Sequence, residues 1–364
     1  MPILCTDDYR ALAQPRLPAD VWDFIDGGSG AELTLDANRR LFDRAQLRPR
    51  VLVDVSVTDT TTKLLGGGLA APLGVAPVAY HRLAHPDGEV ATARGAGATG
   101  ALFVVSIFAS RSLEEIAAAA TGPLWLQLYW LRRRSALADL ARRAQDAGYR
   151  ALVLTVDAPR IGRRLRDQRN SFAVDPAIRA VNLDDALMAT THEPVAGASA
   201  IAAHAAQTFD PSVTWADLAW LRSLTDLPLV LKGVLTAEDA DRAVEHGVDA
   251  IIVSNHGGRQ LDGAVPALRA LPEVVAAVAG RCPVLLDGGV RHGRDVFVAL
   301  ALGASAVLVG RPALWALAVD GADGVAHLLR LLGEELAHTM ALAGRPRLAD
   351  IGRDAVLTPE RADV

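Results

Sequence analysis

Residues 284–309 read VLLDGGVRHGRDVFVALALGASAVLV, and the architecture can be inferred from this stretch outward. It begins and ends with short apolar runs, Val284–Leu286 and Ala306–Val309, which do not alternate with polar residues. Such runs are typical of parallel strands buried on both faces. Gly293–Leu302 between them has a helical pattern, and Gly303 follows it as a helix C-cap. The stretch therefore predicts a strand, a helix and a second parallel strand.

The same unit recurs along the chain. The apolar runs are, in order, Leu73–Ala76, Ala101–Val105, Leu124–Leu128, Ala151–Val156, Leu229–Leu231, Ala250–Val253, Val284–Leu286 and Ala306–Val309. Helical patterns separate them, among them Ser112–Ala120, Ala136–Ala147 and Ala237–Glu245, and Pro312–Ala318 follows the last run. Eight such units predict the α/β class and a closed TIM (β/α)₈ barrel. The alternative is an open doubly wound sheet, which the count and the lack of a GxGxxG after the first strand disfavour.

The remaining segments complete a single domain over residues 1–364. We expect an N-terminal helical extension over residues 1–71, with helices at Asp20–Ile25 and Ala31–Leu41, and the barrel over 72–318. The connection after the fourth strand, about 170–211, is polar and Ala-rich, and its length suggests a lid or mobile loop. Residues 319–364 are expected to form a C-terminal helix, Gly324–Leu342, on the outside of the barrel, and a frayed tail after Leu357.

The composition restricts the class of protein. Hydrophobic residues make up 51% and charged residues 22%, which allows a large core and argues against disorder. A net charge of −5 argues against nucleic acid or an anionic membrane as the main partner. Cys5 and Cys282 form no disulfide framework, and no apolar stretch is long enough to span a bilayer, so a cytoplasmic protein is expected. The nine histidines show no metal-ligand spacing, and no metal site is expected.

Glycines and arginines follow the last two predicted strands. Gly288-Gly289 and Gly310 allow backbone N–H groups to approach an anion, and Arg291 and Arg311 add charge-assisted hydrogen bonds. The loops after strands seven and eight commonly bind phosphate in such barrels. We therefore expect a phosphate-bearing ligand there. Asp287, just before the glycines, is either an acceptor for hydroxyl groups of that ligand or a helix N-cap.

The sixth strand leads into Ser254-Asn255-His256-Gly257-Gly258-Arg259-Gln260-Leu261-Asp262. His256 can act as a base near neutral pH, and Arg259 can hold a carboxylate through two parallel hydrogen bonds. Asp157, after the fourth strand, could orient the imidazole. Lys232 ends a buried strand and needs a negative partner, which an electron-rich cofactor could supply. These groups predict an active site at the carboxyl ends of the strands.

Three runs resemble those of a known family: Leu154–Arg164, Ile252–Asp262 and Leu286–Arg291. They are similar to those of the FMN-dependent 2-hydroxy acid oxidases and dehydrogenases, the glycolate oxidase-like family, and the resemblance extends from about Tyr9 to Leu348. It implies a TIM barrel that binds FMN and oxidises a 2-hydroxy acid to the 2-oxo acid. It also implies a homo-oligomer, tetrameric or octameric.

The resemblance also implies a role for each matching residue. His256 would be the base, Asp157 its partner, Arg164 and Arg259 the carboxylate clamp, and Tyr129 a hydrogen-bond donor to the substrate. Residues expected to contact the cofactor are Pro77, Val78, Ala79, Ser106, Gln127, Thr155, Lys232 and Ser254 along the flavin, with Asp287, Gly289, Arg291, Gly310 and Arg311 around the ribityl phosphate.

One position departs from the family pattern. Phe24 stands where the family usually has a Tyr that helps to hold the substrate carboxylate. Together with Phe108, it suggests an aryl substrate, mandelate or 4-hydroxymandelate, as does the similarity of the Phe24 and Ala76–Arg82 segments to family members that oxidise 4-hydroxymandelate. The expected oxidant is O₂, reduced to hydrogen peroxide.

Several alternatives stay open at this stage. A lactate or glycolate oxidase or dehydrogenase would use the same residues. The base could remove the hydroxyl proton, with hydride transfer, or the α-proton, leaving a carbanion. A barrel that binds phosphate without a flavin, with Lys232 as a Schiff-base lysine, is a further possibility.

Overall fold

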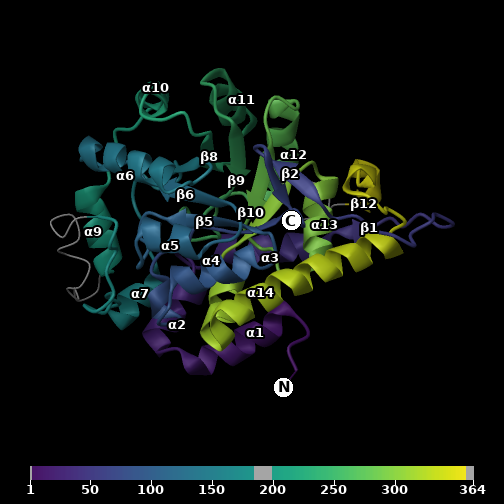
Figure 1. Ribbon diagram of the computed structural model, residues 1–364, viewed down its shortest axis with the longest axis horizontal. Coiled ribbons are helices and arrows are strands. Elements are labelled where there is room, and N and C mark those ends of the chain that lie inside the picture. The colour runs from purple at the N-terminus through teal and green to yellow at the C-terminus, as the bar shows by residue number, and fades with distance from the viewer. Residues whose placement is uncertain (1, 184–198, 358–364) are drawn as a thin grey trace.

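The computed structural model describes residues 2–183 and 199–357. Its centre is a closed barrel of parallel strands, hydrogen-bonded in the order β10-β11-β4-β5-β6-β7-β8-β9 (Figure 1). The strands are β4 (Leu73–Val75), β5 (Leu102–Ser106), β6 (Leu124–Leu128), β7 (Leu152–Thr155), β8 (Leu229–Val234), β9 (Ala250–Val253), β10 (Val284–Asp287) and β11 (Ala306–Val309). Each of the eight predicted runs overlaps one of them, so the predicted TIM barrel is confirmed.

Helices surround the barrel. They are α4 (Glu89–Gly97), α5 (Leu113–Ala119), α6 (Arg134–Asp146), α10 (Leu218–Arg222), α11 (Ala237–Glu245), α12 (Ala267–Val278), α13 (Gly293–Ala301) and α14 (Arg311–Leu342). The backbone of α14 leaves helical geometry at Asp320 and Gly321, where Gly321 has φ +54°. This kink separates the eighth barrel helix from the predicted C-terminal helix, which packs outside the barrel along α4 and α1 (Figure 1).

Two apolar layers explain why the strands read as continuous hydrophobic runs. Side chains such as Leu102, Val104 and Ile252 fill the barrel interior, while their neighbours Phe103, Val105 and Val253 pack against the outer helices. Every position of β5, β7, β9, β10 and β11 is buried. Because both faces of each strand are covered, no polar alternation is needed.

The N-terminal extension contains more than the predicted helices. It has α1 (Thr6–Ala13), a 3₁₀ turn (Gln14–Arg16), α2 (Ala19–Asp26) and α3 (Leu33–Arg44), but also β1 (Gln46–Leu47) and a hairpin of β2 (Thr62–Leu64) and β3 (Gly67–Leu69). Strand β1 pairs with β12 (Val356–Leu357), close to the C-terminus. Leu64 and Leu69 of the hairpin pack with the barrel interior. An entirely helical extension was therefore an incomplete prediction.

The connection after β7 is partly helical. It contains α7 (Leu165–Asn170) and α9 (Ala200–Thr208), and an isolated bridge joins Leu131 to Phe209. The sequence interpretation as a weakly patterned loop missed α9, whose buried residues include Ala200, His204 and Ala205. Small alanines give a weak hydrophobic pattern despite their high helix propensity. Residues 184–198 of the predicted loop, and the predicted frayed tail after Leu357, lie outside the described residues.

Among the described residues, no helix is both long and apolar enough to cross a membrane.

Candidate active site

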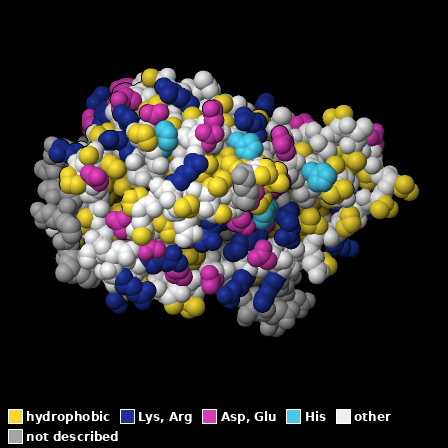
Figure 2. Space-filling model, turned by 90° about the horizontal axis from the view of Figure 1, so that it is seen from below, with side chains coloured by type: hydrophobic (Ala, Val, Ile, Leu, Met, Phe, Trp, Pro, Cys, Tyr) yellow, Lys and Arg dark blue, Asp and Glu magenta, His cyan; other side chains and the backbone are white. Residues whose placement is uncertain are grey.

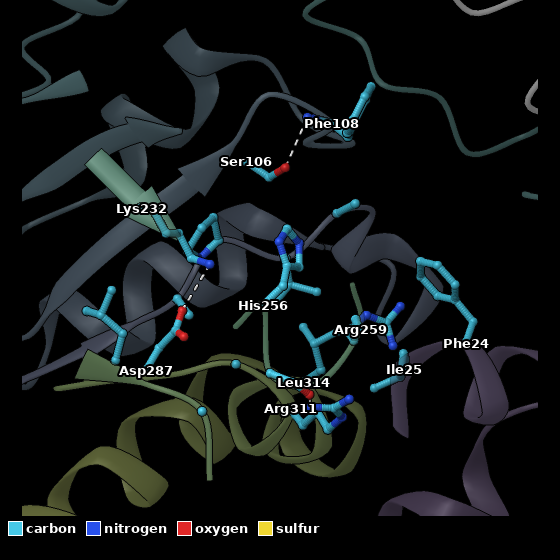
Figure 3. Close-up of a pocket in the computed structure, with 18 of the residues that line it drawn as sticks. Phe24, Ile25, Ser106, Phe108, Lys232, His256, Arg259, Asp287, Arg311 and Leu314 are labelled. Atoms are coloured by element: carbon cyan, nitrogen blue, oxygen red, sulfur yellow. Dashed lines mark hydrogen bonds and ion pairs between the residues drawn. The ribbon is translucent and has the colours of Figure 1, made fainter. Parts of the chain in front are cut away.

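A cavity of about 1130 Å³, counting its open mouth, lies at the carboxyl ends of the barrel strands. Its lining includes most of the expected site residues: Phe24, Pro77, Val78, Ala79, Ser106, Tyr129, Arg164, Lys232, His256, Arg259, Asp287, Gly289, Arg291, Gly310 and Arg311. Figure 3 shows His256 and Arg259 facing the same space as Arg311. Residues from all parts of the chain therefore meet at one rim of the barrel, as the sequence predicted.

His256 lines this cavity and contacts two other expected site residues. Its Nδ1 is 2.9 Å from Asp157 Oδ1, and its Nε2 is 3.3 Å from the Tyr129 hydroxyl. The residue has φ +59°, in the left-handed region, and its backbone N–H donates to Ser254 Oγ at 3.0 Å. A non-glycine residue held in that region is a common mark of a functional site.

The approach of Asp157 to the histidine depends on a glycine. Gly233 follows Lys232 in β8 with φ +112°, and a Cβ at this position would lie 2.6 Å from Asp157 Cβ. The register of β8 with β9 shifts between Lys232 and Val234 at the same point. A larger residue here would move Asp157 away from His256.

The electrostatics favour a neutral imidazole beside an ionised carboxylate. Burial lowers the pKa of His256, and the nearby charge of Lys232 lowers it further, although Asp157 acts in the opposite direction. Burial would raise the pKa of Asp157, but the attraction of a protonated His256, the hydrogen bond from its ring and the charge of Lys232 together lower it. Burial raises the pKa of Tyr129 to about 12, so its hydroxyl stays protonated near neutral pH. His256 Nε2 is therefore available as a proton acceptor toward the cavity.

Two arginines, Arg164 and Arg259, line the same cavity as His256, and their one ion pair among the described residues, Arg164 with Asp167, is long. Burial and the charges of Arg164 and Arg311 lower the pKa of Arg259 well below its ordinary value. Burial lowers the pKa of Arg164 as well, and Asp167, at 4.0 Å, offsets this only in part. Among the described residues, no carboxylate lies within 4.0 Å of the Arg259 guanidinium. Because arginine keeps its charge in proteins, the two groups form a site that an anion would stabilise.

Lys232 has a protein partner that the sequence did not reveal. Its Nζ lies 3.1 Å from Asp287 Oδ2 and donates to Ser254 Oγ at 2.9 Å (Figure 3). Burial would lower the pKa of Lys232, but the Asp287 carboxylate raises it, so the amine stays charged. Asp287 is therefore an ion-pair partner rather than the alternative N-cap, since His292 occupies the cap of α13. Asp287 Oδ1, which is buried, has no hydrogen-bond partner among the described residues.

The other end of the cavity is positively charged and glycine-rich. Gly288 and Gly289 have φ +91° and +88°, and a Cβ on Gly289 would lie 2.4 Å from the Asn38 carbonyl oxygen. Burial and neighbouring arginine charges lower the pKa of Arg291 to about 9. Burial likewise lowers the pKa of Arg311 to about 10, and its guanidinium donates only to backbone carbonyls among the described residues. Arginine side chains without a carboxylate partner, next to glycine backbone N–H groups, are typical of a site that binds a phosphate group.

Four expected residues do not line the cavity. Gln127, Thr155, Ser254 and Asp157 lie directly behind the lining residues. Ser106 Oγ lies 3.2 Å from Gln127 Oε1, and Gln127 Nε2 donates to Thr155 Oγ1 at 3.0 Å. In this geometry Gln127 holds Ser106, and Thr155 holds Gln127.

The sequence interpretation missed one wall of the cavity. Ile201, His204 and Ala205 of α9, with Phe209 after it, line the space next to Phe108. The Phe209 ring stacks on Tyr129 at 4.5 Å and on Phe108 at 6.0 Å between ring centroids. The spacing of buried Ala200, His204, Ala205 and Thr208 was the available signal, because these positions share one helix face.

The N-terminal extension also contributes. The Gly27 carbonyl accepts hydrogen bonds from Arg259 and from Arg311, both at 2.7 Å. Phe172 stacks on Phe24 with centroids 4.5 Å apart and ring planes 6° apart. No sequence motif predicts these contacts.

The donor set fits the expected FMN. The arginines and glycines after β10 and β11 fit a phosphate, and the unpartnered Asp287 Oδ1 fits a hydroxyl donor of a ribityl chain. Pro77, Val78 and Ala79 line the same cavity, and Lys232 supplies a fixed positive charge there. A phosphorylated, hydroxylated and partly electron-rich ligand matches all three features.

Comparisons with known proteins agree with this chemistry. The family model for FMN-dependent dehydrogenases matches residues 13–358. The 4-hydroxymandelate oxidase of Amycolatopsis orientalis is 52% identical over 337 residues, covering 93% of each chain. The L-lactate oxidase of Nostoc sp. is 50% identical and covers 94% of this chain and 95% of its own. A crystal structure of mandelate oxidase with (S)-4-hydroxymandelic acid is 49% identical with a TM-score of 0.94, covering 98% of this chain and 99% of that one.

Proposed function

The chain belongs to the FMN-dependent dehydrogenase family, and from this premise we propose that it oxidises an aryl 2-hydroxy acid, mandelate or 4-hydroxymandelate, to the 2-oxo acid. Its cofactor is FMN, and O₂ is the proposed final acceptor, reduced to hydrogen peroxide. One observation carries the proposal. A histidine base paired with a largely buried carboxylate lies in one cavity with an aromatic wall and two arginines. Arg259 has no ion-pair partner among the described residues, and the ion pair of Arg164 with Asp167 is long, at 4.0 Å.

The chain's own residues have the following roles in the proposed reaction. Arg164 and Arg259 bind the substrate carboxylate, which fixes the α-carbon in front of His256. Tyr129 donates a hydrogen bond to the substrate from beside His256 Nε2. His256 takes a proton at Nε2, and Asp157 holds the ring and stabilises the imidazolium that forms. FMN, when bound, accepts the two electrons. The proton comes from the hydroxyl group or from the α-carbon, and the same base serves either route.

The cofactor residues are proposed from the same geometry. Gly289, Gly310, Arg291 and Arg311 would hold the phosphate, and Asp287 a ribityl hydroxyl. Residues proposed for the flavin ring are Pro77, Val78, Ala79, Ser106 and Lys232 in the lining, and Gln127, Thr155 and Ser254 behind it.

The aromatic wall supports an aryl substrate. Phe108 lies 5.7 Å from Tyr129 and 6.0 Å from Phe209 between centroids, and Ile201 and Ala205 extend the apolar surface. A phenyl ring would gain apolar contact there that a methyl group or hydrogen could not supply. This wall supports the preference more strongly than Phe24, since Phe172 already covers part of that ring.

Two other functions have less support. A lactate oxidase would use the same base and arginines, and the L-lactate oxidase of Nostoc sp. is 50% identical, so a short-chain substrate is the second candidate. A Schiff-base mechanism needs an uncharged amine. The ion pair with Asp287 keeps Lys232 charged, which argues against that chemistry.

The proposed function predicts a yellow protein whose flavin is reduced by aryl substrates. Under anaerobic conditions, mandelate and 4-hydroxymandelate should bleach the visible flavin band at least about tenfold faster than glycolate at equal subsaturating concentration, because one apolar group in a pocket contributes roughly 1–3 kcal/mol. Stopped-flow absorbance measures the rates. Equal or faster bleaching by glycolate would contradict the aryl preference, and a colourless protein would contradict the whole proposal.

The base should also set the acid limb of the pH profile. His256 acts only when neutral, and its pKa lies below the ordinary value of 6.5. Therefore kcat/KM for mandelate should be level around pH 7 and above, and should fall on acidification only below about pH 6.5, by tenfold per pH unit. An acid limb centred well above pH 7 would show that the imidazole is not the neutral base that the cavity supports.

We also propose a cytoplasmic homo-oligomer, tetrameric or octameric by family analogy. The location rests on the two-cysteine sequence. The assembly has some support from the segment that protrudes after β1 in Figure 1, where Val51, Leu52 and Val57 are 83%, 103% and 76% exposed. Figure 2 shows apolar side chains gathered toward one end of the molecule, while basic and acidic side chains are interspersed over the rest of that face. Exposed apolar groups of this kind are typical of subunit contacts.

A further inference from the structure

The ring of Phe24 lies against both clamp arginines. The Arg259 and Arg164 guanidinium carbons are 5.2 Å and 5.8 Å from the Phe24 ring centroid. Figure 3 shows the Arg259 guanidinium directed toward this ring. Phe24 is 4% exposed, so the contacts are shielded from water. Both distances are within the range of a cation–π interaction, which is strongest when desolvated.

The arginines need such a partner. Arg164 is buried and Arg259 is half-buried, and desolvation together with their mutual repulsion lowers the pKa of Arg259. Arg164 Nε has no hydrogen-bond partner among the described residues, and the nearest carboxylate, Asp167, is 4.0 Å away. The negative face of an aromatic ring reduces the cost of two such charges without neutralising them. A carboxylate closer than Asp167 would form tight ion pairs with the arginines and compete with the substrate.

The surroundings keep the Phe24 ring in place. Phe172 stacks on it at 4.5 Å with nearly parallel planes. Helix α2, which carries Phe24, ends at Asp26, and the next carbonyl, that of Gly27, accepts a hydrogen bond from Arg259. One short segment therefore supplies both a ring and a carbonyl to the same guanidinium.

We propose that Phe24 is a positioning residue whose ring holds Arg164 and Arg259 in place, as charged groups open to a substrate carboxylate. The inference rests on the proposed function, because the clamp matters only if the substrate is a carboxylate. It gives the departure from the family's tyrosine a physical role. At this position the ring acts through the arginines, where a tyrosine hydroxyl would reach the carboxylate directly.

The test measures equilibrium binding of two non-oxidisable ligands to the FMN-loaded enzyme by calorimetry. Phenylacetate carries the carboxylate, and phenylacetamide is its neutral counterpart. Phe24→Leu should raise the Kd of phenylacetate about tenfold, as expected for loss of a desolvated cation–π contact, and change the Kd of phenylacetamide by less than about twofold. Phe24→Trp and Phe24→Tyr keep a ring and should bind phenylacetate within about threefold of the parent.

The control is Phe172→Leu, which removes an aromatic ring from the same stack but leaves Phe24. This control should lower the thermal stability of the enzyme but leave its preference for phenylacetate over phenylacetamide close to that of the parent. If Phe24→Leu does not fold, Phe24→Met provides the same comparison. The inference is overturned if the ring-less variants bind phenylacetate as tightly as the parent, or if both ligands weaken equally. If the parent itself does not prefer phenylacetate, the proposed clamp fails together with this inference.

Discussion

Replacement of His256 by glutamine is expected to lower the rate of flavin reduction by mandelate about 10³-fold, within the range that general-base catalysis contributes. Glutamine can still form a hydrogen bond with Asp157, but its amide cannot accept a proton near neutral pH. Arg164, Arg259 and the glycines after β10 are unchanged, so FMN content and phenylacetate binding should stay near the parent values. Anaerobic stopped-flow absorbance measures the rate.

A matched control is His246→Gln. His246 is exposed at the end of α11, far from the cavity lining, and its replacement should leave the reduction rate within about twofold of the parent, as is usual for surface substitutions. If His256→Gln reduces its flavin at near the parent rate, the assignment of the base is wrong, whichever proton is removed first.

Replacement of Arg259 by methionine is the second large effect. We expect kcat/KM for mandelate to fall at least about 30-fold, because the loss of one partner from a desolvated, charge-assisted contact costs roughly 2–5 kcal/mol. Methionine preserves much of the apolar volume beside Phe24 while removing the charge. Steady-state hydrogen peroxide production over a range of mandelate concentrations separates KM from kcat.

The control for this substitution is Arg160→Met, at an exposed position of the connection after β7. It should change kcat/KM by less than about twofold. FMN content should be retained in Arg259→Met, since Arg291 and Arg311 remain. An unchanged kcat/KM in Arg259→Met would remove this residue from the clamp, and loss of FMN instead would assign it to the cofactor site.

Much of the barrel could be predicted because buried parallel strands give short, continuous apolar runs in the sequence. Runs such as Ala250–Val253 are apolar at every position, and a Gly follows most of the helices between them. The hairpin of β2 and β3 has no such pattern, since each strand has only three residues and the hairpin contains three glycines, Gly66, Gly67 and Gly68. Helix α9 was missed because alanines make a weak pattern.

The kinds of residue at the site could be predicted as well, since all eight strands deliver their carboxyl ends to one rim. Which of those residues contact one another could not be predicted from the sequence. Lys232 was expected to depend on a cofactor for its counter-charge, yet Asp287 from the other side of β9 supplies it. Gln127 and Thr155 were expected in the lining, but they hydrogen-bond to each other behind Ser106.

The amino-acid sequence by itself determined the (β/α)₈ order, the charged and glycine-rich strand ends, and the placing of His256, Arg164, Arg259 and the glycines after the last two strands at one rim. These follow from local periodicity and from the polarity of parallel strands, which need no knowledge of distant contacts. Only the tertiary structure decided that Phe24 lies against both arginines, that Phe209 closes an aromatic wall, and that Lys232 pairs with Asp287. Those contacts join segments far apart in the chain, and they exist only once barrel closure and the packing of α2 and α9 fix the distances between them.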